Sequence, residues 1–101
     1  MKNPRYYDLA GKKTASVNKL KQTFTAEIRD LCNEMNEFVV SNPHMAEELV
    51  TNTIYDIATR AHELANFAYY HLEIYTSSDW DYIKAKISQV MNKAIEEVHK
   101  K

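Results

Sequence analysis

The chain has 101 residues, which is enough for one domain and too few for two. Apolar residues make up 45% and charged residues 27%, a balance that excludes an intrinsically disordered chain. The net charge of −1 argues against a nucleic-acid mimic, the single cysteine excludes a disulfide framework or a four-cysteine zinc site, and one glycine with two prolines nearly excludes an all-β fold.

A first helix is predicted over about residues 14–40. Its apolar residues recur three or four positions apart, at Val17, Leu20, Phe24, Ile28, Leu31, Met35 and Phe38. This spacing places them on one face of an α-helix. The helix is expected to end at Ser41, with Asn42 as the N-cap of a second helix and Pro43 in that helix's first turn.

The second helix is predicted to run unbroken over residues 43–75 as a long central rod. Its main apolar stripe is Ala46, Val50, Ile54, Ile57, Ala61, Leu64, Ala68, Leu72 and Tyr75, and a neighbouring stripe is Tyr55, Ala58, His62, Ala65 and Tyr69. An apolar arc this wide indicates contact with two neighbouring elements. The alanines Ala58, Ala61, Ala65 and Ala68 are small enough to let another helix approach closely.

A third helix is predicted over residues 79–99, with Ser78 and Asp81 resembling a capping box. Its apolar residues are Ile83, Ile87, Val90, Met91, Ala94, Ile95 and Val98. Short connections join antiparallel helices, so the expected fold is an all-α, up-down-up three-helix bundle forming one domain over 1–101. The long second helix carries more apolar surface than two neighbours would cover, which predicts a homo-oligomer, with a dimer favoured.

Charge is segregated along the chain. Residues 1–21 carry a net +5, residues 22–81 a net −9 and residues 82–101 a net +3. The basic side chains of the first segment, which begins with an arm over 1–13, are Lys2, Arg5, Lys12, Lys13, Lys19 and Lys21. The favoured interpretation is neutralisation by the acidic middle, within the chain or between protomers. With Tyr6 and Tyr7 alongside, the segment is alternatively a nucleic-acid-binding element.

Aromatic residues are expected to gather at one end of the bundle. The residues near this end are Tyr6, Tyr7, Phe67, Tyr69, Tyr70, Tyr75, Trp80 and Tyr82. Three interpretations stay open: the end of the core, an interface with a second copy, or a binding site for another protein. The partner-binding candidates from this set are Phe67, Tyr69, Tyr70, Tyr75, Trp80 and Tyr82.

Four carboxylates share one face of the first helix, namely Glu27, Asp30, Glu34 and Glu37. They form either a solvated outer face or a docking strip for a basic partner, such as residues 1–21 of another protomer. A dimetal site in a helical bundle uses paired Glu-x-x-His motifs. Glu96 and His99 alone have that spacing, so no metal and no cofactor are expected.

Catalytic candidates are few. The segment Ala61-His62-Glu63-Leu64 resembles the opening of the histidine phosphotransfer motif, and the resemblance implies phosphotransfer through His62; where that family has Lys-Gly, this chain has Ala65-Asn66. Cys32 borders the apolar face and is expected to be an inert small hydrophobe. No nucleophile–base grouping or glycine-rich phosphate loop can be assembled, so the protein is not expected to be an enzyme.

The sequence therefore predicts a small non-enzymatic helical module that binds a partner protein. Regulators, inhibitors, immunity proteins and chaperones share this size and build, and nucleic-acid binding and phosphotransfer through His62 remain the alternatives. No apolar run approaches a membrane span, and the first residues lack the apolar region of a secretory signal. We therefore expect a cytosolic protein without membrane partners, or one in the host cytosol if the gene is viral.

Overall fold

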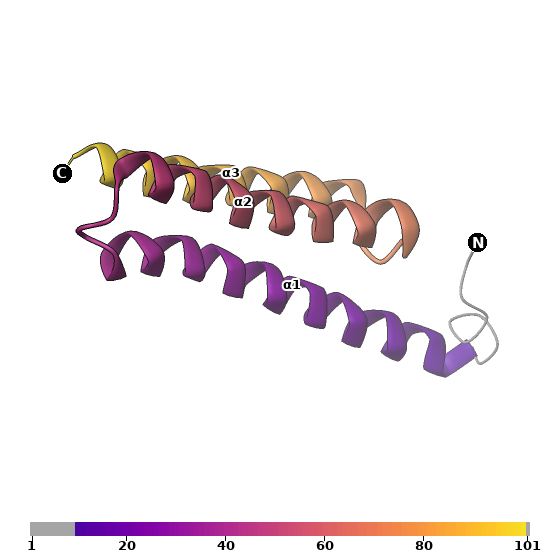
Figure 1. Ribbon diagram of the computed structural model, residues 1–101. Coiled ribbons are helices and arrows are strands. Elements are labelled where there is room, and N and C mark those ends of the chain that lie inside the picture. Colours follow the sequence, from indigo (N-terminus) through magenta and orange to yellow (C-terminus); the bar gives the residue numbers. More distant parts are fainter. Residues whose placement is uncertain (1–9, 101) are drawn as a thin grey trace.

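Three antiparallel helices pack side by side in an up-down-up arrangement (Figure 1). The computed structural model describes the backbone of residues 10–100 and the side chains of residues 16–100. The helices are α1 (Ala10–Ser41), α2 (Glu47–Asn66) followed by a π-helical turn η2 (Phe67–His71), and α3 (Ser77–His99). No strand forms within the described residues, and the predicted all-α three-helix bundle is confirmed.

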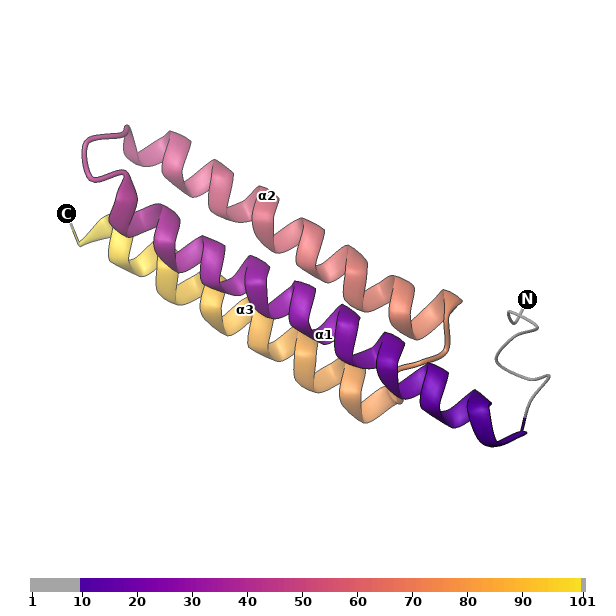
Figure 2. The same ribbon diagram turned by 90° about the horizontal axis from the view of Figure 1, so that it is seen from below.

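The longest helix is the first and not the second. α1 has 32 residues, whereas α2 has 20 and η2 adds five. Figure 2 shows the N-terminal turns of α1 projecting beyond the connection between η2 and α3. The prediction of a long central helix over 43–75 is therefore wrong in its length and in both of its boundaries.

The second helix begins four residues later than predicted because Asn42 is used elsewhere. Its side-chain amide donates a hydrogen bond to the carbonyl of Phe38 at 2.9 Å, which satisfies an unpaired acceptor in the last turn of α1. The turn that follows places Ala46 in an extended conformation, with φ −55° and ψ 135°, directly before the helix. Glu47 and Glu48 occupy the first turn of α2, where the helix dipole favours carboxylates.

The second helix ends before residue 75 because the chain turns back into the core. The amide of Leu72 donates to the carbonyl of Phe67, which is the wide spacing of a π-helix, and Glu73 adopts a left-handed φ of 54°. A left-handed non-glycine residue costs on the order of 1 kcal/mol. The reversal buries Ile74 and Tyr75, and each such burial contributes about 1.5–3 kcal/mol. Tertiary packing therefore outweighs the local preference for helix.

Side chains from all three helices form one continuous core. Its buried residues include Ile28, Met35, Val39, Val50, Ile54, Ile57, Ile87, Ala94 and Val98. The predicted alanine seam of α2 is part of this core, since Ala58, Ala61, Ala65 and Ala68 are all at most 2% exposed. Small side chains at these positions let α1 and α3 pack closely against α2.

A capping box starts α3 two residues earlier than predicted. The Thr76 hydroxyl accepts a hydrogen bond from the Asp79 amide, and the Asp79 carboxylate accepts one from the Thr76 amide, both at 3.1 Å. The predicted box at Ser78 and Asp81 is wrong because Thr76 is the residue with the extended backbone that an N-cap needs. Lys21 Nζ lies 2.7 Å from Asp79 Oδ2, so an ion pair connects α1 to the N-terminus of α3.

Removing the Asp79 carboxylate is expected to destabilise the protein in a pH-dependent way. The hydrogen bond from Lys21, with those from Thr76, holds the pKa of Asp79 below its ordinary value. A carboxyl whose pKa is depressed by folding stabilises the fold above its unfolded pKa, and this contribution is lost as the pH falls through the folded value. Asp79→Ala should therefore lower the free energy of unfolding by about 1 kcal/mol at neutral pH.

Urea unfolding of the Asp79→Ala variant and the parent, followed by circular dichroism, measures this difference at several pH values. The difference should shrink on the acid side of about pH 4, where an ordinary aspartate becomes protonated. Asp81→Ala is the matched control, because Asp81 is an exposed acid of the same helix with no ion-pair partner among residues 16–100. A difference that does not change with pH contradicts the role given to the carboxylate charge.

Candidate functional site

The predicted aromatic residues separate into distinct contacts. Tyr69 stacks on Trp80, with ring centroids 4.3 Å apart and planes 5° apart, and Tyr70 meets Trp80 edge-on at 5.3 Å. Trp80 Nε1 also donates a hydrogen bond to Asn66 Oδ1 at 2.9 Å, which joins α3 to the end of α2. Phe67 instead stacks on Phe24 of α1, at a centroid distance of 6.3 Å.

The remaining two candidates differ sharply in exposure. Tyr75 is only 4% exposed, its hydroxyl is 2.8 Å from the Thr25 hydroxyl, and burial raises its pKa, so this ring belongs to the core. Tyr82 is 70% exposed and lies beside a groove between α1 and α3. Tyr75 is therefore part of the core, and the six rings do not share one environment; binding of a second copy or another protein by the exposed rings stays a prediction.

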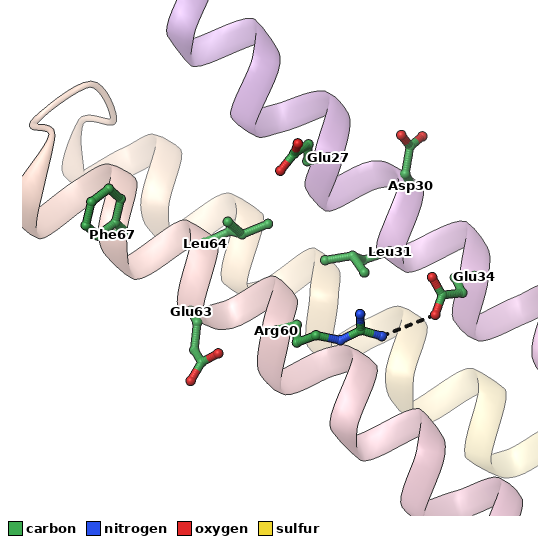
Figure 3. A pocket seen from close by; sticks show the side chains of 8 residues that line it. All are labelled: Glu27, Asp30, Leu31, Glu34, Arg60, Glu63, Leu64 and Phe67. Atoms are coloured by element: carbon green, nitrogen blue, oxygen red, sulfur yellow. Dashed lines mark hydrogen bonds and ion pairs between the residues drawn. The ribbon is translucent and has the colours of Figure 1, made fainter.

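A groove between α1 and α2 unites two of the predicted features. It has a volume of about 580 Å³, and the residues that line it are Glu27, Asp30, Leu31, Glu34, Arg60, Glu63, Leu64 and Phe67. Figure 3 shows Leu31 and Leu64 pointing toward one another between the two helices, with Phe67 of η2 further along the chain. Three members of the carboxylate strip thus stand beside an aromatic partner-binding candidate, whereas Glu37 does not line the groove.

The rim of this groove is acidic. Arg60 Nη2 lies 3.2 Å from Glu34 Oε2 across the groove, and both side chains are more than half exposed, so the pair contributes at most about 1 kcal/mol. Among residues 16–100, no cationic group forms an ion pair with Glu27, Asp30 or Glu63. The groove therefore combines an apolar floor with three carboxylates that have no ion-pair partner within residues 16–100, which favours a ligand that is apolar along one edge and basic around it.

Sequence reasoning had Glu27, Asp30, Glu34 and Phe67 as site candidates but not the other four lining residues, Leu31, Arg60, Glu63 and Leu64. Arg60, Glu63, Leu64 and Phe67 follow the spacing i, i+3, i+4 and i+7, which is the signature of one helix face. Leu31 and Leu64 were both expected in the apolar stripes, and both remain half-buried at the rim of the core. The spacing could have revealed the α2 side of the groove, but only the packing shows that it faces the carboxylates of α1.

The basic segment is only partly described. Lys2, Arg5, Tyr6 and Tyr7 lie outside the described residues, and so do the side chains of Lys12 and Lys13. Lys19 is exposed, and Lys21 forms its ion pair with Asp79. At Lys21 the neutralisation occurs within the chain, as the favoured interpretation expects, while nucleic-acid binding by the segment stays a prediction.

His62 is half-buried and Cys32 is buried, and phosphotransfer through His62 stays a prediction. Burial, together with the charge of Lys84, lowers the pKa of the half-buried His62. The chain departs from the phosphotransfer motif at Ala65 and Asn66. Ala65 is fully buried in the core, and Asn66 accepts a hydrogen bond from Trp80. Burial raises the pKa of the Cys32 thiol, and Lys86 opposes this shift without cancelling it, so the thiol stays protonated and weakly nucleophilic.

No family model, curated protein or solved structure matches this chain, so its function is argued from geometry. Within the described residues, no helix is long and apolar enough to cross a lipid bilayer. The same part of the chain brings no three histidine, cysteine or acidic side chains close enough together to hold a metal ion. The α1–α2 groove is consequently the strongest candidate site.

Proposed function

We propose that this protein is a non-enzymatic docking module of the cytosol that binds a partner protein through the α1–α2 groove. The partner segment is a basic amphipathic helix. The observation that carries this proposal is the apolar floor of Leu31, Leu64 and Phe67 beneath the exposed carboxylates of Glu27, Asp30 and Glu63. A helix laid in such a groove contacts both walls, with apolar side chains at i, i+3, i+4 and i+7.

In this proposal the apolar floor of the groove supplies affinity, and its carboxylates supply association rate and orientation. Phe67 is 45% exposed, so its remaining surface is available to an apolar anchor of the partner. Covering it, with the leucines beside it, supplies most of the affinity. The carboxylates at Glu27, Asp30 and Glu63 attract lysine or arginine side chains, which raises the association rate and fixes the orientation of the bound helix.

The test uses a fluorescein-labelled amphipathic peptide of about 18 residues, with leucines at the anchor positions and lysines elsewhere. Fluorescence anisotropy should show binding to the protein at low salt, and a peptide with glutamates in place of the lysines should not bind. Phe67→Ala is expected to weaken binding about 10- to 30-fold, as for an interface anchor. Glu27→Lys should slow association and weaken the salt dependence.

Two matched controls separate the groove from the rest of the surface. Tyr55 is another exposed ring of α2, at 48%, but it does not line the groove, so Tyr55→Ala should leave the affinity unchanged. Glu37→Lys makes the same charge change on α1 outside the groove and should have little effect. Equal losses from Phe67→Ala and Tyr55→Ala, or equally tight binding of the acidic peptide, would contradict the proposal.

A further inference from the structure

The opposite flank of α1 carries the opposite charge. A second groove of about 410 Å³ lies between α1 and α3, and its charged lining residues are Arg29 and Lys86. No carboxylate lines it; its other lining residues are apolar, aromatic, amide or hydroxyl side chains and Cys32. Arg29 lines the basic groove, and its neighbour in the sequence, Asp30, lines the acidic groove.

The basic groove combines two exposed cationic side chains with an exposed tyrosine. Neither Arg29 nor Lys86 forms an ion pair with any carboxylate among residues 16–100. Tyr82 is 70% exposed beside them, next to the half-buried Ile83. This groove therefore offers cations around a large amphipathic ring, and the α1–α2 groove offers carboxylates around an apolar floor.

We propose that the α1–α2 groove of one copy binds the α1–α3 groove of a second copy. The α3 wall of that groove, which carries Tyr82 and Lys86, is then the basic helix that the docking site receives, so this inference rests on the proposed function. Arg29 and Lys86 of the second copy face Glu27, Asp30 and Glu63 of the first. Tyr82 of the second copy packs against Leu31, Leu64 and Phe67, so the interface has a ring at its centre and ion pairs around it.

The proposed contact joins two different surfaces, and this determines the form of the assembly. After pairing, one copy keeps its basic groove free and the other keeps its acidic groove free, so association continues beyond two copies into a ring or an open chain. The molecule measures 54 × 21 × 18 Å, and a long face of these dimensions can supply the roughly 800 Å² per partner of a standard interface. The dimer that the sequence analysis favoured is therefore not the expected end product.

Sedimentation velocity over about 10–300 μM protein tests the inference. The mean mass should rise with concentration past that of a dimer at about 50 mM salt, and it should fall toward the monomer at about 500 mM salt. Asp30→Lys reverses a charge in the acidic groove, and Lys86→Glu reverses a charge in the basic groove. Each substitution should block binding through that groove, so each variant alone should stay monomeric. Mixing the two variants should restore association, because each supplies the groove that the other lacks.

Controls make the same charge changes two helical turns away, at positions that do not line either groove. Glu37→Lys on α1 and Lys93→Glu on α3 should associate like the parent protein. A protein that stays monomeric at every concentration overturns the inference, and so do variants that associate normally or a mixture that stays monomeric. Binding of an acidic helical peptide to the basic groove of a strictly monomeric protein also overturns it and points to a different partner.

The experiments distinguish failure of self-association from failure of the proposed docking function. The Lys86→Glu variant keeps an intact α1–α2 groove, so it should bind the basic amphipathic peptide as tightly as the parent protein does. A monomeric protein that still binds this peptide therefore refutes self-association and leaves the docking function standing. Failure of the peptide to bind an established monomer refutes the docking function itself.

Discussion

Tyr75→Ala is expected to lower the free energy of unfolding by about 3–5 kcal/mol, the range for removing a large ring from a core. Tyr75 is 4% exposed and lies beyond η2, where the left-handed Glu73 turns the chain back toward the helices. Its ring fills space next to α1, and its hydroxyl is hydrogen-bonded to Thr25. The substitution removes both contacts and leaves a cavity that the surrounding helices cannot fully close.

Urea unfolding measures this loss, and two variants divide it into its parts. Tyr75→Phe keeps the ring and removes the hydrogen bond, so it should cost about 1 kcal/mol. Tyr82→Ala removes a tyrosine that is 70% exposed and should change the stability by less than about 0.5 kcal/mol. Equal effects of Tyr75→Ala and Tyr82→Ala would show that Tyr75 is not a core residue and that the chain reversal is misplaced.

Ala61→Leu is the second substitution with a large expected effect. Ala61 is fully buried in the seam where α2 meets its neighbours, so added methylene groups force the helices apart or drive side chains out of their preferred rotamers. The expected loss is about 1–3 kcal/mol of unfolding free energy. Ala85→Leu adds the same atoms at an exposed position of α3 and should change the stability by less than about 0.5 kcal/mol.

Thermal unfolding of these two variants gives a direct comparison. The melting temperature of Ala61→Leu should fall by several degrees, while that of Ala85→Leu should stay within about 2 °C of the parent. Unchanged melting of Ala61→Leu would mean that the interior of the bundle holds a space large enough for a leucine side chain. Close packing of α2 against its neighbours would then be incorrect.

The periodic spacing of apolar residues was enough to predict the three helices and the burial of the alanine seam. This works because helix formation in a bundle depends mainly on burying one continuous face. The two connections between the helices were harder to predict. Asn42 suits the start of one helix as well as the end of another, and only the folded chain shows that it binds the Phe38 carbonyl. The reversal at Glu73 opposes local preference, so no local pattern indicates it.

For the candidate site too, the sequence predicts which residues share a helix face, but not which neighbouring helix that face meets. Spacing placed Glu27, Asp30, Glu34 and Glu37 on one face of α1, but which of them border a groove depends on where α2 lies. The aromatic residues were expected at one end of the bundle because the up-down-up arrangement brings the end of the second helix and the start of the third together. Tyr69, Tyr70 and Trp80 do meet there. The π-turn and the reversal after it instead send Tyr75 into the core and leave Phe67 beside α1.

The central claim is that the α1–α2 groove is the docking site, and a chemical-shift map tests it most directly. Isotope-labelled Lys86→Glu protein, which keeps the α1–α2 groove and is expected to be monomeric, is titrated with the basic amphipathic peptide, and backbone amide shifts are followed by nuclear magnetic resonance. The largest shifts should fall on residues 27–34 of α1 and 60–67 at the end of α2, with little change around Tyr82. Largest shifts around Tyr70 and Trp80, or no shifts at a saturating peptide concentration, would contradict the claim.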